Sequence, residues 1–544
     1  MTALAAVPAA LEFQAPSIDY RAVAPMLVVF GGALVAVLVE AFVPRARRLG
    51  VQAVVGVLSI AGGLVAVIVQ AVSGHPVETA GIARTGTAVL GSVVVDRPAL
   101  FLQGTILALA LVAALTMAER SVEEGGPFAP QASAVPGSSA EAAARRAGMV
   151  QSEVFPLLLF SVGGMLLFPA SNDLLTMFVA LEVFSLPLYL MCGLARRRRL
   201  LSQEASMKYF LLGAFSSAFF LYGTAMLYGF AGSVRLADIA GAISGRDGGT
   251  VVLQKDGLLL LGVAMIAVGL LFKVSAAPFH TWTPDVYQGA PTPVTGFMAA
   301  CTKVAAFGAL LRVFYVALPD VRWDWSPALW GVAILTMVVG SVIAIVQTDV
   351  KRMLAYSSIA HAGFLLTGVL AMDKSGISGV LFYLAAYGFT TLGAFAIVSL
   401  VRDAGDGEEG VVGGEATHLS QWAGLGRRHP VTAGLFTLFL LAFAGIPLTS
   451  GFMGKYAVFS AAVANGGWVL ALIGVLASAV AAFFYVRVIV LMYFSEPAGG
   501  QAVVAQPGVG TMFAIILAAA ITVLLGVVPS VLLNQAAASS VFLP

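Results

Sequence analysis

The sequence predicts an all-α polytopic membrane protein. Of its 544 residues, 60% are apolar and 10% are charged, and the mean hydropathy is +0.96, whereas about a quarter of the residues of a soluble domain are charged. Apolar runs of about 20 residues, the length that crosses a bilayer, recur along the whole chain. Two of these runs contain proline and glycine at their centres, which predicts broken helices.

Taking about 20 residues for each crossing, we expect about 14 transmembrane helices. The first is followed by basic residues and is not preceded by a basic segment, so we interpret it as a membrane helix and not as a cleaved signal. The expected spans are 23–43, 51–72, 97–118, 154–170, 173–194, 207–231, 257–277, 292–317, 327–347, 352–372, 376–401, 431–462, 467–494 and 511–534.

The placement of basic residues predicts the orientation of these helices. With the N-terminus outside, the most basic loops all fall on the cytoplasmic side, as the positive-inside rule requires. An even number of spans then puts the C-terminus outside as well. The basic residues of these loops are Arg45, Arg47, Arg48, Arg120, Arg145, Arg146, Arg196 to Arg199, Lys351, Arg352, Arg402, Arg427 and Arg428.

The two broken spans are the seventh and the twelfth. Pro278 follows the apolar part of the seventh, and Pro447 lies between Gly445 and Gly451 in the twelfth. Interruptions five spans apart predict an internal repeat of spans 4–8 and 9–13. Because five helices are an odd number, the second copy is inverted, an architecture in which transporters bind ions near the midplane. Ordinary proline kinks, which membrane helices tolerate, are the alternative.

These features divide the chain into five regions. The segment after the third span is rich in Ala, Gly, Ser and Pro, a composition typical of a flexible loop. The expected regions are three N-terminal helices in 1–118, a flexible cytoplasmic loop in 119–150, the first five-helix unit in 151–320, the second in 321–495, and a loop with the last helix in 496–544.

Three lysines lie within or beside the apolar runs: Lys273, Lys303 and Lys455. A charged lysine at the bilayer centre costs about 2.5–3.5 kcal/mol on insertion scales, so such residues usually line an ion pathway. The alternative is a lysine that reaches the interface or forms an ion pair that only orients its helix.

Glu182 is the expected acidic partner of these lysines. It lies about 13 Å along its helix from the outer end, near the midplane. A carboxylate and an ammonium in contact keep each other charged, so Glu182 with Lys273 or Lys208 forms a candidate switchable pair. Lys208 also follows Glu204 by four residues, and an ordinary i,i+4 surface pair explains it equally well.

His280 and His361 are candidate proton relays, because histidine titrates closest to neutral pH. A buried structural role is equally compatible with each of them. Arg312 and Arg487 lie near the ends of their spans, where we expect interfacial anchors.

No metal or cofactor site is expected in this chain. Cys192 and Cys301 are far apart, without a CxxC pair or nearby histidines at metal-ligand spacing. The sequence has no phosphate-binding GxxxxGK[ST] motif and no GxGxxG after a strand. Any redox chemistry must therefore belong to other chains.

Three strings carry a family resemblance: PFHTWTPDVYQGAPTPVTGFMAACTKVAAF, DVKRMLAYSSIAHAGF and GIPLTSGFMGKY. They resemble, in order, the signatures of the subunit N family of bacterial NADH-quinone oxidoreductase (respiratory complex I), and the likeness extends over spans four to thirteen. The resemblance implies an antiporter-like, proton-translocating membrane-arm subunit of 14 helices with two inverted five-helix units. The segment 119–150 looks like an insertion relative to that family.

The resemblance also implies the site and its partners. Glu182, Lys273, Lys303 and Lys455 match the family's charged helix residues, and Lys208 matches less closely. NADH, FMN, iron–sulfur clusters and quinone would bind other subunits, whose reactions drive protons across the bacterial inner membrane. The expected neighbours are sibling antiporter-like subunits and lipid.

Two other functions remain compatible with the sequence. A Mrp-type cation/proton antiporter would share the fold and the lysines, although such proteins more often read HTWLPDAH where this chain has HTWTPDVYQGAPTPV. A structural subunit of the same complex would use the ion pairs only to hold helices together.

Overall fold

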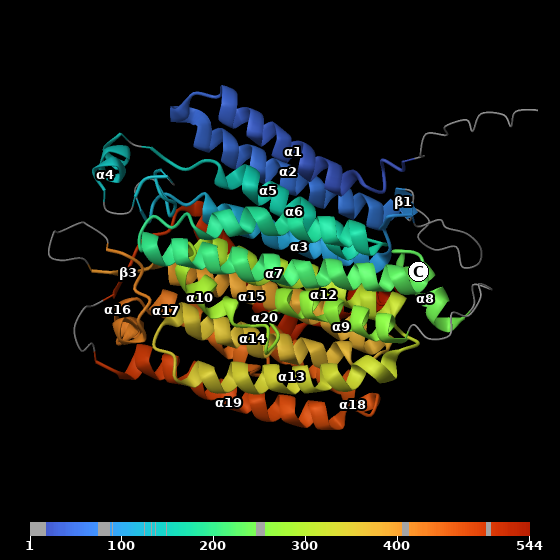
Figure 1. Cartoon of the computed structure of the whole chain (residues 1–544). Coiled ribbons are helices and arrows are strands. Elements are labelled where there is room, and N and C mark those ends of the chain that lie inside the picture. The colour runs from blue at the N-terminus through green and yellow to red at the C-terminus, as the bar shows by residue number, and fades with distance from the viewer. Residues whose placement is uncertain are drawn as a thin grey trace, which may run out of the picture.

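The computed structural model describes residues 18–73, 87–89, 91–123, 126–131, 133–135, 138–147, 149–245, 256–404, 413–496 and 502–543. Most helices run side by side between two ends of one bundle, with α4, β3 and α16 at one end and β1 and α8 at the other (Figure 1). The helices are α1 (Ala24–Phe42), α2 (Arg45–Ser73), α3 (Arg97–Met117), α4 (Ser139–Arg146), α5 (Val154–Leu167), η1 (Phe168–Ala170), α6 (Leu174–Cys192), α7 (Arg199–Ala231), α8 (Leu236–Ser244), α9 (Asp256–Lys273), α10 (Trp282–Gly289), α11 (Thr292–Phe297), η2 (Met298–Thr302), α12 (Lys303–Arg312), η3 (Val313–Ala317), α13 (Arg322–Ile345), α14 (Val350–Val369), α15 (Lys374–Leu400), η4 (Leu419–Trp422), α16 (Leu425–Arg428), α17 (Pro430–Ala444), α18 (Ser450–Ala464), α19 (Trp468–Phe494), α20 (Val509–Val527) and α21 (Ser530–Ala538). The strands are β1 (Thr87–Val89) with β2 (Val93–Val94), and β3 (Val401–Asp403) with β4 (Ala502–Val504), each an antiparallel pair.

The described helices match the expected spans in number and order. Among the described residues, ten helices are long and apolar enough to cross a membrane, and the helical segments 154–170, 257–273 and 430–444 are shorter apolar helices at three further expected spans. The remaining expected span corresponds to α14, a 20-residue helix that carries several polar side chains. The prediction of an all-α polytopic membrane fold is confirmed.

The largest difference in boundaries is at α7, which begins at Arg199 instead of 207. Its first two turns are polar and were therefore outside the apolar run. They are held by side chains that reach the end of α6: Ser202 donates to the Cys192 carbonyl at 2.7 Å, and Ser206 to the Tyr189 carbonyl at 2.6 Å. These bonds satisfy two of the last carbonyls of α6, which have no partner within that helix, and they fix the first turns of α7 against α6.

The break in the seventh span separates α9 from α10. Its backbone groups are satisfied inside the protein: the Ala277 amide donates to the Thr336 hydroxyl of α13 at 2.9 Å, and the Trp282 indole donates to the Phe272 carbonyl at 3.0 Å. Ser275 lies in the left-handed region at φ 66°. Neighbouring helices thus supply the bonds that the interrupted helix lacks.

The break in the twelfth span separates α17 from α18. Gly445 ends α17 with φ 83°, a conformation that glycine adopts without steric cost, and Leu448 has φ 70°. The carbonyls of Phe443 and Ala444, which have no helical partner, accept hydrogen bonds from Lys455. A charged side chain therefore completes this helix end.

A third interruption, which the sequence did not predict, divides the last span. Residues 511–534 were expected to be continuous, but α20 ends at Val527 and α21 begins after Pro529, which lacks an amide donor. A Cβ on Gly526 would lie 2.3 Å from the Leu448 carbonyl oxygen. The third break is therefore packed directly against the break of the twelfth span.

The two broken spans have opposite directions. From α9 to α10 the chain runs from the α8 end of the bundle toward the α16 end, and from α17 to α18 it runs the other way (Figure 1). Each break occupies the fourth span of its five-helix unit. These relations are those of the predicted inverted repeat.

The described part of segment 119–150 is attached to the bundle. The Ala129 amide donates to the Leu194 carbonyl at 2.8 Å, and Glu119 accepts from the Gly508 amide at 2.8 Å. The segment also contains the short helix α4. This attachment was not expected from its composition, because the partners lie far away in sequence.

Arg312 is not the interfacial anchor that we expected. It is fully buried, and its Nη2 lies 2.7 Å from Oδ1 of Asp96, whose side chain is 1% exposed. Its Nε donates to the Pro169 carbonyl at 2.6 Å, and the ring of Phe542 covers its guanidinium at 4.9 Å. The prediction was wrong because the partner, Asp96 at the N-cap of α3, is remote in sequence.

A buried row of lysines

Lys303 lies at the centre of the bundle, on the first turn of α12. Its side chain is buried, and Nζ donates to the carbonyl oxygen and the hydroxyl of Ser358 on α14, at 2.6 and 2.7 Å. The ring of Tyr387 lies 5.4 Å from Nζ. A π-helical turn, η2, directly precedes Lys303 and rotates it relative to a regular helix; such turns are frequent at functional sites.

His361 follows Ser358 by three residues on the same face of α14. Its Nδ1 is 2.6 Å from the Tyr383 hydroxyl and its Nε2 is 3.4 Å from the Tyr485 hydroxyl. The Tyr387 ring, which also contacts Lys303, is 4.9 Å from the imidazole. His361 therefore lies next to Lys303 in a connected group of hydroxyl-bearing side chains.

Lys455 lies on the other side of His361. Its Nζ donates to the Phe443 and Ala444 carbonyls at 2.8 and 3.0 Å and to the Ser478 hydroxyl at 2.7 Å. The Phe443 ring is 5.6 Å from that of His361. The structure thus brings Lys303, His361 and Lys455 into one buried row, with the broken helix at its far end.

Lys273 ends α9, at the first break, and belongs to the first unit. Its Nζ donates to the Ser185 hydroxyl at 2.8 Å and to the Tyr189 hydroxyl at 3.3 Å, both on α6. The rings of Phe184 and Tyr209 are each 5.5 Å away. Hydroxyl and aromatic groups therefore surround this ammonium.

Glu182 lies one turn before Ser185, on the same helix. Its side chain is half-buried, and its Oε1 is buried without a hydrogen-bond partner. Within the described residues, no ion pair of 4.0 Å or less joins Glu182 to Lys273 or to Lys208. The predicted direct contact is therefore absent in this conformation, and Ser185 stands in its place as the neighbour of Lys273.

Lys208 instead belongs to an ion-pair cluster around Asp285 that connects the two units. Its Nζ is 2.7 Å from a carboxylate oxygen of Glu204, the i,i+4 pair that was the simpler interpretation, and 2.7 Å from Asp285 on α10. The other oxygen of Asp285 is 2.5 Å from Arg352 on α14. Asp285 is thus clamped between a cation of the first unit and a cation of the second.

Replacing Asp285 with asparagine removes both ion pairs and leaves Lys208 and Arg352 facing each other. Because all three side chains are partly exposed, we expect a loss of only about 1 kcal/mol of stability. The midpoint of thermal unfolding of the purified complex measures it. Glu204→Gln is the control, since it removes a single exposed helix pair; equal shifts in the two variants would refute the clamp.

His280 does not join the row. It lies in the α9–α10 break with a half-buried side chain, and its Nδ1 has no hydrogen-bond partner among the described residues. The flanking Pro278 and Thr281 are exposed. The structure therefore places this histidine at the break between α9 and α10, outside the row, and its role as a relay stays a prediction.

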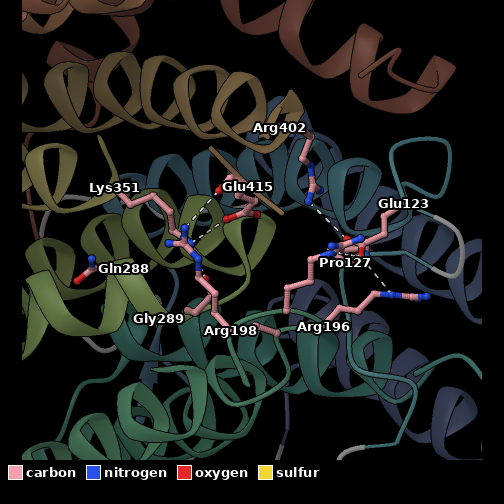
Figure 2. A pocket seen from close by; sticks show the side chains of 12 residues that line it. Glu123, Pro127, Arg196, Arg198, Gln288, Gly289, Lys351, Arg402 and Glu415 are labelled. Atoms are coloured by element: carbon pink, nitrogen blue, oxygen red, sulfur yellow. Dashed lines mark hydrogen bonds and ion pairs between the residues drawn. The ribbon is translucent and has the colours of Figure 1, made fainter. Parts of the chain in front are cut away.

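A small charged cavity lies at the α16 end of the bundle, where the sequence predicts the cytoplasm (Figure 2). Its volume is about 40 Å³, room for about three water molecules. Lys351, at the start of α14, donates to the Ala290 carbonyl at 2.7 Å and is 3.3 Å from Glu415. Glu123 is 3.3 Å from Arg196 and 3.4 Å from Arg402. Charges from four remote segments meet here.

Glu415 remains ionised in this cavity. Burial raises the pKa of its carboxyl group, but Lys351 and Arg402 lower it, and the net result is a pKa below the usual value. Lys351 lies seven residues before Ser358, about 10 Å along α14 and on nearly the same face. One helix therefore connects the charged cavity to Lys303.

Several of these residues were not singled out from the sequence. Tyr485 carries a hydroxyl of the row, but a tyrosine in a membrane helix is by default a packing residue. Asp285 and Glu415 lie in polar stretches, where nothing distinguishes them from surface carboxylates. For Asp285 the one available signal was its place in the TWTPD string.

Comparisons with known proteins agree with this architecture. Residues 171–481 match the family described as NADH:quinone oxidoreductase/Mrp antiporter, transmembrane. Among curated relatives, NADH-quinone oxidoreductase subunit N 3 of Streptomyces griseus is 58% identical over 542 residues, covering 98% of this chain and 96% of the relative. Subunit N of Mycobacterium tuberculosis is 57% identical over 537 residues, with 96% and 98% covered.

Solved structures show the same fold. A chain of respiratory complex I from Thermus thermophilus superimposes with a TM-score of 0.72 at 30% identity, covering 94% of this chain and 99% of that one. A chain of the Mrp complex from Dietzia has a TM-score of 0.77 at 20% identity, with 96% and 97% covered; at that identity the likeness concerns the fold alone. The protein therefore belongs to the subunit N family of NADH-quinone oxidoreductase, the antiporter-like membrane subunits of respiratory complex I.

Proposed function

We propose that this subunit moves protons across the membrane, driven by NADH oxidation and quinone reduction in other subunits of the complex. The observation that carries the proposal is the continuous buried group formed by Lys303, His361 and Lys455. Three ionisable side chains connected through aromatic rings, each with hydroxyl neighbours, are costly to bury at membrane depth and are typical of proton relays. FMN, iron–sulfur clusters, NADH and quinone would all be bound elsewhere in the complex.

Proton uptake would occur at the charged cavity around Lys351 and Glu415. From there the polar face of α14 leads to Ser358 and Lys303. The side chains of Tyr287 and Tyr387 both interact with the Ser358 hydroxyl, so water molecules that enter this region would find hydrogen-bond partners. A proton on Lys303 would pass by way of His361 to Lys455 and leave on the opposite side.

Glu182 would act as the switch of this path. Its unpaired Oε1 and half-buried position leave it open to a neighbouring subunit as well as to Lys273. A rotation that brings Glu182 within contact of Lys273 would hold that ammonium charged, and its withdrawal would release the proton.

The membrane placement follows from the same proposal. The protein would lie in the bacterial inner membrane with both termini outside, since the end with α16 and the charged cavity carries the basic loops. Its lateral partners would be sibling antiporter-like subunits of the membrane arm.

The test is to measure protons translocated per NADH oxidised, using the complete complex in proteoliposomes. Glu182→Gln is expected to lower that ratio, because the neutral amide cannot hold the Lys273 ammonium charged. Glu204→Gln, which neutralises an exposed carboxylate, is the matched control and should leave the ratio unchanged. An unchanged ratio in an intact Glu182→Gln complex would support a purely structural subunit instead.

A further inference from the structure

A second cavity at the α16 end of the bundle is walled by the end of α19, by η4 and by the turn between α13 and α14. Its volume is about 310 Å³, at the lower end of the range of sites that bind small organic ligands. The Gly424 amide, just before α16, donates to the Leu491 carbonyl of α19 at 3.2 Å, so the cavity lies beside α16. The wall residues that matter below are Thr348, His418, Ser420, Arg487 and Ser495.

Arg487 lies at the level of a membrane interface. The first residue of α19, Trp468, is exposed, and tryptophan is enriched where a membrane meets water. Arg487 follows Trp468 by 19 residues, about 29 Å of helix, and the hydrocarbon core of a bilayer is about 30 Å thick. The guanidinium therefore lies where the lipid head groups begin, in the leaflet that the proposed orientation makes cytoplasmic.

The Arg487 guanidinium is held in place but is not neutralised. Its Nη1 donates at 2.7 Å to the carbonyl of Ile345, the last residue of α13, whose carbonyl has no partner within its own helix. Among the described residues, Arg487 makes no ion pair, and its Nε and Nη2 have no partner. The Asp349 carboxylate in the neighbouring turn caps α14 instead, through the amides of Lys351 and Arg352. A positive charge therefore remains at the cavity.

The other polar side chains of the described wall can all donate hydrogen bonds. The Nδ1 of His418 accepts from the Ser420 amide at 3.3 Å, so the neutral imidazole carries its proton on Nε2 and donates from there. Thr348 and Ser495 add hydroxyls, and no carboxylate belongs to the described wall. Donors around a guanidinium fit a phosphate ester, because the planar guanidinium binds phosphate oxygens with two parallel hydrogen bonds.

The surface that leads from the cavity toward the membrane centre is apolar. Val338 and Val342 of α13 and Phe483 and Val486 of α19 are exposed there. The two helices lie side by side along the bundle (Figure 1), and the bond from Arg487 joins them at this end. A ligand whose phosphate reaches Arg487 can therefore lay long apolar chains against both helices.

We propose that this cavity binds the head group of one anionic phospholipid from the leaflet on the α16 side. The phosphate lies against Arg487 and His418, the rest of the head group fills the cavity, and the acyl chains follow α13 and α19 toward the membrane centre. A lipid with a net negative charge is favoured because Arg487 has no counter-charge of its own. Basic pockets between membrane helices on the cytoplasmic side are typical sites for anionic head groups.

The experiment follows the release of deuterated phosphatidylglycerol from the purified complete complex into detergent, with mass spectrometry counting the labelled lipid that remains. Arg487→Gln nearly keeps the shape of the cavity, and release of one lipid per complex is expected to become about tenfold faster, or about 1.4 kcal/mol. Thr348→Phe fills the cavity and is expected to abolish retention of that lipid, while the Thr348 carbonyl still accepts from the Leu419 amide. Arg427→Gln is the matched control, because Arg427 is an exposed arginine of α16 that does not line the cavity.

Two further arms identify the ligand. Deuterated phosphatidylcholine, which has a phosphate but no net charge, is expected to leave faster than phosphatidylglycerol. Excess inorganic phosphate is expected not to displace the lipid, because it has no acyl chains.

Equal release rates in Arg487→Gln and Arg427→Gln would overturn the assignment, and so would equal retention of the two lipids or displacement by inorganic phosphate. Density for a segment of a neighbouring subunit inside the cavity, in a cryo-electron microscopy map of the complex, would overturn it as well. Because proton transfer is not measured, failure here leaves the proposed function untouched.

Discussion

Replacing Lys303 with alanine is expected to slow proton transfer through this chain by about a hundredfold, the usual effect of removing a positioned proton-transfer group. Lys303 is the member of the row that contacts both Ser358 and Tyr387. Without the Lys303 ammonium, no donor would remain beside His361 to pass a proton on to Lys455. Alanine is smaller than lysine and fits at this position without displacing α12. The contacts that the other residues of α12 make therefore remain, and the complex should assemble.

The measurement is the number of protons translocated per NADH in proteoliposomes, together with the rate of NADH oxidation. Lys374→Ala is the control, since Lys374 is exposed at the start of α15. Normal pumping by an assembled Lys303→Ala complex would show that the row is not the proton path. Loss of pumping in both variants would point to a general effect on assembly.

Replacing Arg312 with methionine is expected to destabilise the subunit by about 3–5 kcal/mol, because it leaves the Asp96 carboxylate buried without its counter-charge. The pair is more deeply buried than any other ion pair among the described residues, with side chains 0% and 1% exposed. The expected consequence is a lower amount of subunit in the membrane and earlier thermal unfolding of the complex.

The double variant Asp96→Asn/Arg312→Met separates charge from packing. Asparagine can still cap α3 as Asp96 does through the Ala99 amide, and no lone charge remains, so most of the lost stability should return. Arg487→Met, at an exposed arginine that donates to the Ile345 carbonyl, should cost less than about 1 kcal/mol. A double variant as unstable as Arg312→Met would contradict the charge explanation.

The sequence predicted the helices well because each one is a local property. An apolar run of about 20 residues is sufficient to specify a span, whatever lies beside it. The breaks at Pro278 and Pro447 were recognisable for the same reason. The division of the last span at Pro529 was missed, because a proline near the end of an apolar run also marks an ordinary helix end.

The site was predicted less completely. Lys303 and Lys455 were identified by their cost in a membrane and His361 because histidine titrates closest to neutral pH, and the structure brings them together. The switchable pair of Glu182 with Lys273 stays a prediction: Ser185 and Tyr189, on the same face of α6 as Glu182, hold the Lys273 ammonium in this conformation, and Glu182 interacts with it electrostatically. The i,i+4 pair of Lys208 with Glu204 was predicted from the sequence. Its second partner, Asp285, could not be predicted from the sequence.

The sequence by itself determined that this is a polytopic membrane protein with about 14 expected spans, that the seventh and the twelfth span are interrupted, and that lysines lie within or beside the apolar runs. Only the tertiary structure decided which partners these charged side chains meet. Lys303 and Ser358 are 55 residues apart, and Arg312 and Asp96 are 216 apart. The physical reason is that the cost of membrane insertion depends on the composition of one helix, whereas an ion pair depends on how two distant helices pack.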